Sequence, residues 1–117
     1  MSTSVNEPTS IVPIWPALVI PVLTVLSNTG TLHRKDLFDA AADVAGLGTD
    51  ARSETLGCGG YRYEQRLGWA LSNVLKAGWV DRPSRGYYAI NDAGRHGLQR
   101  HSGGFVYAQA REFFAPF

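Results

Sequence analysis

Hydrophobic side chains recur at helical spacing in the stretch 61–77. At about 100° per residue they fall together on one side, which predicts a helix with one buried stripe. Gly78 follows directly and is typical of a helix end. The residues of the predicted stripe are Leu67, Ala70, Leu71 and Val74, with Leu75 at its edge.

The opposite side of this predicted helix is polar and carries more cations than carboxylates, with only Glu64 nearby. Arg can donate paired hydrogen bonds to guanine, Gln and Asn can pair with adenine, and Arg or Lys can neutralise phosphate. A solvated helix face is the alternative reading of such a pattern, and it stays open. The outward residues are Arg62, Gln65, Arg66, Trp69, Asn73 and Lys76.

A basic hairpin is predicted directly after this helix. Trp79 and Val80 read as a short apolar strand, residues 81–86 as a basic turn, and residues 87–90 as a second strand. A helix followed by a two-stranded hairpin with a basic tip is the second half of a winged helix. That unit places a helix in a DNA groove and a charged loop beside it.

The first half of the chain supplies two further predicted helices. Residues 13–28 form the first, with Pro16 suited to its first turn and Pro21 expected to bend it. Residues 31–33 read as a short strand that joins the sheet of the hairpin. Residues 34–45 form the second helix, whose predicted inner stripe is Leu37, Phe38, Ala41 and Val44.

The remaining segments are less regular. Residues 46–60 form a glycine-rich loop, in which Thr49 or Asp50 is expected to cap a single turn over 51–56. Such a loop before a helix can hold an anion, here a DNA phosphate. After the hairpin, Asn91 or Asp92 is expected to cap a fourth helix that runs to about residue 99, and an aromatic helix is predicted over 105–114.

Together these elements predict a mainly α fold with a small antiparallel sheet, arranged as a winged helix. Three segments are expected along the chain. Residues 1–11 form a disordered tail, residues 12–100 the winged-helix domain, and residues 101–117 an aromatic helix that packs on the domain or on a partner.

Overall charge is uninformative, because the net charge of the 117 residues is only +1, but its distribution is uneven. Residues 60–101 hold seven Lys or Arg against three acids, a local charge of +4, and residues 35–54 hold two cations against five acids, a local charge of −3. A molecule with separated charges of this kind can approach DNA in one orientation.

The single cysteine, Cys58, excludes an intrachain disulfide and a thiolate zinc site, and it suits a reducing cytoplasm. The three histidines do not have metal-ligand spacing with it, so we expect neither a metal nor another cofactor. The apolar run 11–26 is interrupted by three prolines and is too short for a membrane span. No secretion signal is apparent, because no cation precedes this run. We therefore expect a cytoplasmic protein.

Trp69 fits a solvated face poorly, because an exposed indole in the middle of a polar helix side is unusual. Either the glycine-rich loop or the carboxyl-terminal segment covers it, or it contacts nucleic acid or a partner. Tyr61 and Tyr63, at the start of the same helix, raise the same question.

Several short motifs in this part of the chain follow one another in a fixed order. They are Arg66-x-x-Trp69-Ala70, Leu75-Lys76-Ala77-Gly78, Pro83-x-Arg85-Gly86-x-Tyr88-x-Ile90 and Gly94-Arg95. In this order and spacing the stretch resembles the N-terminal domain of Mrr-type restriction endonucleases, and the resemblance covers roughly residues 12–98. The glycine-rich loop around Cys58 and the aromatic carboxyl-terminal segment lie outside the family pattern.

The resemblance implies a winged helix that binds double-stranded DNA. Family members are commonly fused to a nuclease, and some belong to restriction systems directed at modified DNA. The stretch after Ile90 leaves no room for a nuclease domain, so we expect a non-enzymatic module that works with a fused or separate nuclease. No nucleophile–base pair and no carboxylate cluster are apparent, so no catalytic residue is predicted.

The resulting hypothesis is a DNA-binding targeting module, with N6-methyladenine and 5-methylcytosine both open as the base read. A winged helix used for protein contact or as a homodimer is the alternative. The candidate residues for base edges or adjacent phosphates are Arg62, Gln65, Arg66 and Asn73. The hairpin candidates, for contacts to the DNA backbone or minor groove, are Arg82, Ser84 and Arg85. The candidates for a base methyl group are Tyr61, Tyr63 and Trp69.

Overall fold

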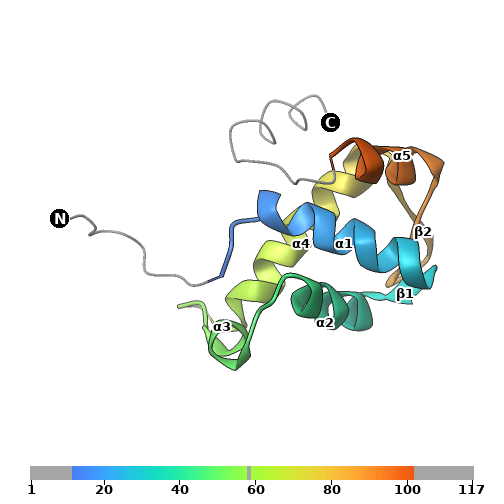
Figure 1. The fold of residues 1–117 in the computed structure, drawn as a ribbon. Helices are drawn as coiled ribbons and strands as arrows, with labels where there is room; N and C mark the ends of the chain where they lie inside the picture. The colour runs from blue at the N-terminus through green and yellow to red at the C-terminus, as the bar shows by residue number, and fades with distance from the viewer. Residues whose placement is uncertain (1–11, 58, 102–117) are drawn as a thin grey trace.

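The computed structural model describes residues 12–57 and 59–101 of the chain. Five helices and three strands occur in this described part (Figure 1). Their order is α1 (Pro16–Thr29), β1 (Leu32–His33), α2 (Arg34–Val44), α3 (Thr49–Ser53), α4 (Arg62–Lys76), β2 (Val80–Ser84), β3 (Tyr87–Ile90) and α5 (Asp92–Arg100).

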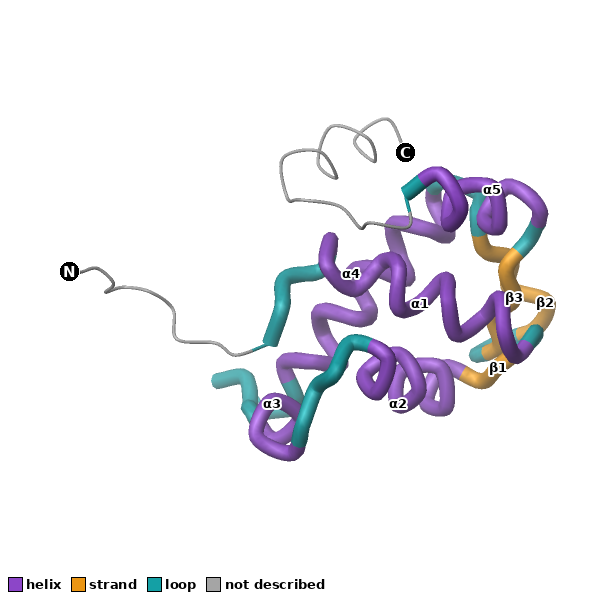
Figure 2. Tube along the Cα trace, viewed as in Figure 1, coloured by secondary structure: helices purple, strands orange, loops and turns teal. Residues whose placement is uncertain are grey.

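The three strands form one antiparallel sheet in the order β1-β3-β2, at one end of the helices (Figure 2). The two-residue strand β1 pairs with β3, so that Leu32 lies opposite Tyr88 and His33 opposite Tyr87. The prediction of a third strand before the second helix is therefore confirmed. The mainly helical fold with a small antiparallel sheet, arranged as a winged helix, is confirmed as well.

Helix α1 is the centre of the hydrophobic core. Its most extensive contacts are with α2 and α4, and it also touches α5 and β3. Apolar side chains surround it on most sides, which is the pattern of a helix enclosed by other elements. Pro16 lies in its first turn as predicted, and Pro21 is buried inside it. Its fully buried leucines are Leu18, Leu23 and Leu26.

The inner stripe of α2 differs from the prediction at one position. Leu37, Phe38 and Ala41 are buried, but Val44 is 53% exposed, so its assignment to the core was wrong. The helix ends at Val44, and the chain turns back so that the backbone N–H of Leu47 donates to the carbonyl of Ala42 over 2.9 Å. Leu47 is buried and fills the core at this end of the helix.

The loop 46–60 contains one short helix, α3, whose start also differs from the prediction. Thr49 and Asp50 lie inside the helix, and the capping position is Gly48, which provides no side-chain hydrogen bond. Neither predicted cap is therefore used. Cys58, the tail 1–11 and the expected aromatic helix 105–114 lie outside the described residues.

The wing is longer than predicted and its turn is tighter. Strand β2 runs to Ser84, so only Arg85 and Gly86 connect it to β3, with Gly86 at φ +82°. The predicted six-residue turn was wrong, because residues 82 and 83 continue the strand through an irregular register between Asp81 and Ser84. Pro83 cannot donate a backbone hydrogen bond, and it is accommodated in this outer strand of the sheet.

Helix α5 packs tightly against Trp79, which is buried and precedes β2 instead of belonging to it. The amide oxygen of Asn91 accepts from the backbone N–H of Gly94 over 2.9 Å, so the predicted cap at Asn91 is confirmed. Gly97 faces the indole of Trp79, and His101 stacks on that ring with 6.2 Å between centroids. Within residues 12–57 and 59–101 the structure contains no helix of the length and apolarity that crossing a membrane requires.

Replacing Gly94 by Ala is expected to destabilise the fold by about 3 kcal/mol. The added Cβ would lie 2.2 Å from the carbonyl oxygen of Trp79 and 2.6 Å from Cγ1 of Ile90, so the backbone has to move. This overrides the gain of about 1 kcal/mol that Ala brings to a helix interior. Chemical denaturation measures the change. The matched control is Gly57→Ala, where the Cβ meets nothing within 4 Å, and equal stability of the two variants would contradict the packing described.

Candidate nucleic-acid interface

Helix α4 has the two unlike sides that the sequence predicts. Its stripe of Leu67, Ala70, Leu71 and Val74 is buried against the rest of the core. On the outer side Gln65 and Lys76 are exposed, and the indole of Trp69 is 58% exposed. Neither the glycine-rich loop nor any other described segment covers this indole. The alternative prediction, that the carboxyl-terminal segment covers Trp69, concerns residues outside the part that the structure describes.

Tyr63 is not on the outer side, although it was a candidate for contact with a base methyl group. Only 8% of it is exposed, and it belongs to the core. The reason is helical spacing, because Tyr63 precedes Leu67 by four residues and so extends the buried stripe by one turn. Burial raises the pKa of its hydroxyl, and the nearby Glu64 and Asp39 add to the rise. Tyr61, in contrast, is 47% exposed.

Arg62 is held at the beginning of α4 by an ion pair with Glu54. The backbone makes the same connection, since the N–H of Arg62 donates to the carbonyl of Glu54 over 3.0 Å. An isolated bridge between Thr55 and Tyr61 closes this junction. Arg62 therefore joins the loop before α4 to the helix through both its Nε and its backbone N–H.

Arg66 anchors the segment before α1. Its guanidinium donates to the carbonyl of Val12, which is buried. Loss of water around the side chain lowers the pKa of Arg66, and the positive charge of Arg62 lowers it further, while Glu54 acts in the opposite direction. The contact holds the segment against α4 and creates a hollow of about 300 Å³ on the outer surface. Its lining residues are Ile14, Trp15, Gln65, Arg66 and Trp69.

Asn73 lies half-buried on the outer side of α4, and its side-chain NH₂ donates to the carbonyl of Trp69 over 2.8 Å. The amide oxygen and the second N–H are not used in this bond. Asn73 also lines a second, larger hollow of about 500 Å³ that follows the same helix side. This hollow is lined by Arg34, Gln65, Gly68, Trp69, Ser72, Asn73 and Lys76.

Arg34, from the start of α2, is a residue of this surface that the sequence analysis did not select. Its guanidinium carbon lies 4.6 Å from the centre of the Phe38 ring, and it reaches the middle of α4 beside Gly68. A signal was present, because a single glycine inside an otherwise regular helix often marks a close approach by another group. Which group approaches depends on the tertiary arrangement of α2 and α4.

The tip of the wing adjoins the same surface. Arg82, Ser84 and Arg85 are all exposed. The backbone N–H of Arg34 donates to the carbonyl of Gly86 over 2.8 Å. The rings of His33 and Tyr87 also meet edge to face, with 5.2 Å between their centroids. The start of α2 therefore connects the wing tip to the outer side of α4.

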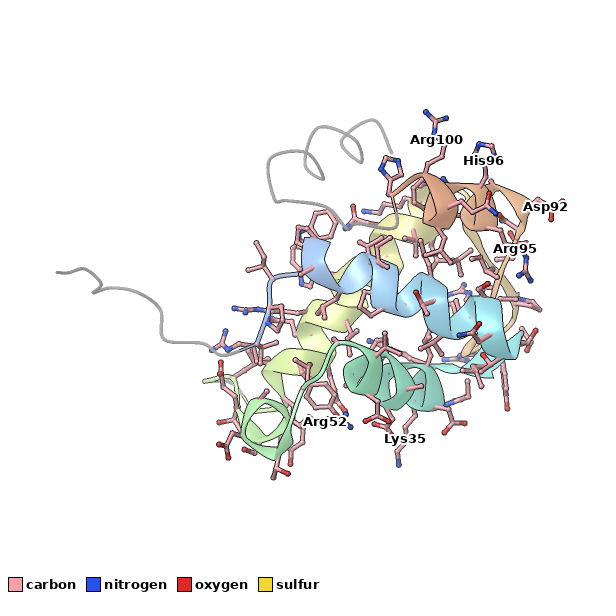
Figure 3. The ribbon with its side chains drawn as sticks, viewed as in Figure 1. Lys35, Arg52, Asp92, Arg95, His96 and Arg100 are labelled. Atoms are coloured by element: carbon pink, nitrogen blue, oxygen red, sulfur yellow. The ribbon has the colours of Figure 1, made fainter. Side chains whose placement is uncertain are left out.

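Helix α5 carries a separate group of basic side chains. Figure 3 shows His96 and Arg100 projecting outward from α5, and Arg95 on the side of the same helix that faces α1. Arg95 lies within 3.4 Å of the hydroxyl of Ser27 on α1. The positive charge counted along residues 60–101 is thus shared among α4, the wing and α5.

Comparison with known proteins places the chain beside a protein family and a curated relative. The family described as the Mrr N-terminal domain matches residues 15–100. The type IV methyl-directed restriction enzyme EcoKMrr of Escherichia coli (strain K12) is 34% identical over 85 residues, which cover 71% of this chain. The matched part is 28% of that enzyme, so the chain corresponds to less than a third of its relative. No solved structure matches the chain.

Because Arg66 supports the fold, replacing it by Ala is expected to cost roughly 2 kcal/mol of stability through loss of a charged hydrogen bond to a buried carbonyl. The neighbouring exposed Gln65 is the control, and Gln65→Ala is expected to stay within about 0.5 kcal/mol of the original protein. Thermal and chemical unfolding measure both changes. An Arg66→Ala variant as stable as the original would contradict the anchoring role.

Proposed function

The chain belongs to the Mrr N-terminal domain family, and from this premise we propose that it is a winged-helix module that binds double-stranded DNA. In this proposal α4 enters the major groove and the wing lies along the adjacent backbone. The module would direct a nuclease, fused or separate, to its target. A cytoplasmic location belongs to the same proposal.

The observation that carries the proposal is the composition of the outer side of α4. From Gln65 to Lys76 the helix contains no carboxylate. Gln65, Trp69 and Lys76 are exposed there, and the partly buried polar residues beside them are Arg66, Ser72 and Asn73. The wing tip, with two exposed arginines, is connected to this side through the start of α2. A surface that offers hydrogen-bond donors and positive charges, and no carboxylates, is suited to bind DNA phosphates and the edges of bases.

The role proposed for each candidate follows from its position and exposure. Gln65 and Asn73 have exposed or half-exposed amides on the outer side of α4 and are the candidates for base edges. The candidates for backbone contacts are Lys76, Arg82, Ser84 and Arg85. Arg62 and Arg66 remain in the proposal with a different main task, since both hold the interface in shape.

The proposal extends to a methylated base, because the similar Escherichia coli enzyme is described as methyl-directed. A methyl group in the major groove is recognised by apolar contact. Trp69 offers the largest exposed apolar side chain on α4, and Ile14 and Trp15 extend the apolar surface beside Gln65. Tyr61 lies at the start of α4 and is the second aromatic candidate.

The same apolar surface favours a second candidate function, contact with another protein or with a second copy of this chain. Ile14 is 46% exposed and Trp69 58% exposed, and both line one hollow. Exposed apolar residues that gather at one place often mark protein interfaces. Salt dependence separates the two candidates, because an apolar protein contact is much less sensitive to salt than binding to DNA.

DNA affinity is expected to fall steeply with salt, with a logarithmic slope of about 0.9 for each phosphate contact. The double variant Lys76→Ala, Arg85→Ala is expected to lower that slope by about 2, because it removes two phosphate contacts. Fluorescence anisotropy with a labelled duplex at several salt concentrations measures both quantities. Lys35→Ala, which removes one positive charge outside the interface, is the control and is expected to leave the slope nearly unchanged, since Figure 3 shows Lys35 pointing away from the molecule on the outer side of α2.

Binding to methylated duplex is expected to depend on Trp69. Three duplexes of one sequence are titrated against the original protein and a Trp69→Ala variant. One is unmodified, one carries N6-methyladenine and one carries 5-methylcytosine. We expect about tenfold tighter binding of one methylated duplex, in line with about 1 kcal/mol or more per base contact. The variant is expected to lose this preference while still binding DNA. Equal affinity of the original protein for all three duplexes would remove the reader role and leave general DNA binding intact.

A further inference from the structure

We infer that Arg34 is a phosphate-binding residue of this interface and that Gly68 is the gap in α4 that positions it. This inference rests on the proposed DNA-binding function and adds a residue from outside α4 and the wing. It also gives Gly68, which the proposed function does not use, a defined task.

The position of Arg34 is fixed by three contacts. Its backbone N–H donates to Gly86 at the wing tip over 2.8 Å. Its guanidinium lies over the Phe38 ring at 4.6 Å, within the range of a cation–π contact. Its terminal nitrogen Nη2 lies beside Gly68 in the middle of α4. The side chain is nevertheless exposed, so the guanidinium is held in place and still accessible to a ligand.

Gly68 makes this position possible. A Cβ at Gly68 would lie 3.1 Å from Nη2 of Arg34 and 3.9 Å from the Phe38 ring. The first distance is tighter than an ordinary van der Waals contact, so a Cβ at this position requires the guanidinium to move by a few tenths of an ångström from its place over the Phe38 ring. Glycine weakens the interior of a helix relative to alanine, so the room that Gly68 leaves for Arg34 comes at a cost in helix propensity.

The ligand is assigned as phosphate because of the helix from which Arg34 extends. In helix-turn-helix proteins the helix before the recognition helix crosses the DNA backbone. Here α2 is the last long helix before α4, since only the five-residue α3 lies between them. The bond to Gly86 puts the backbone of Arg34 beside the wing tip, whose Arg85 is also a backbone candidate. A guanidinium supported on an aromatic ring is well suited to a fork of two hydrogen bonds to phosphate.

The positions of the other cations on α4 support the same assignment. The two arginines of α4 are engaged in the fold, Arg62 with Glu54 and Arg66 with Val12. Lys76, the remaining cation of the helix, lies in its last turn. Arg34 therefore places a guanidinium beside the middle of α4, where the helix itself contributes amides, a hydroxyl and an indole.

The test measures the affinity of the full chain for an unmodified duplex at several salt concentrations. Arg34→Ala is expected to weaken binding about tenfold at 0.1 M salt and to reduce the salt slope by about 1, equally for unrelated duplex sequences. Lys35→Ala, which removes the same charge from the next position, is expected to bind nearly as the original protein does. Arg34→Lys is expected to keep the slope but lose about threefold in affinity, because an ammonium group lacks the planar fork.

Gly68→Ala provides an independent test through a double-mutant cycle. Alone it is expected to weaken binding about threefold, because the guanidinium is displaced. In the Arg34→Ala background it is expected to change the affinity no further. A loss that persists in that background would overturn the role of Gly68 as a gap for Arg34. If Gly68→Ala fails to fold, the comparison of Arg34→Ala with Arg34→Lys still decides the role of Arg34.

The failures of the inference and of the proposed function are distinguishable. If the original protein shows no salt-dependent binding to DNA, the proposed function is wrong and this inference falls with it. If the original protein binds and Arg34→Ala binds equally well, only the inference is overturned. A loss confined to particular sequences, with an unchanged salt slope, would make Arg34 a base-reading residue and overturn the phosphate assignment.

Discussion

The structure depends on the burial of α1 between α2 and α4. Helix α1 has apolar side chains on most of its surface, so it has to be enclosed. Helix α4 meets this need with one stripe of leucine, alanine and valine, and the packing of that stripe fixes which residues point outward. The candidate interface is therefore a consequence of the core, because the orientation of Gln65, Trp69 and Lys76 is set by what the opposite side of α4 contacts.

Two of the cations that make the sequence of α4 look like a DNA-binding helix are used to shape the site. Arg62 joins the helix to the loop before it, and Arg66 holds the segment at Val12. An arginine that is partly desolvated and bonded to a buried carbonyl contributes to stability even if it also lies near a phosphate. Counting cations along a helix thus overestimates the charge available to a ligand.

Much of the fold follows from periodicity in the sequence, and the differences have local causes. The stripe of α4 and the cap at Asn91 depend on residues close in the chain, and both were predicted correctly. The strand at Leu32 was also predicted correctly, although its partner Tyr88 is distant in the chain. Val44 was misplaced because the chain turns back and Leu47 fills the core instead. The wing turn was predicted too long because Arg82 and Pro83 resemble turn residues, although they continue an irregular outer strand.

The candidate site was less predictable, because its residues come together only in the tertiary structure. Tyr63 could have been recognised as a core residue from its four-residue spacing to Leu67, but Arg34 reaches α4 from another helix. The bond from Arg34 to Gly86 and the contact of His33 with Tyr87 tie the start of α2 to the wing. These contacts add to the packing of α1 against β3 and of α4 against β2, which also connects the wing to the helices. The outer side of α4 and the wing tip are thereby held in a fixed relation, and a preorganised surface of this kind loses little conformational entropy when it binds.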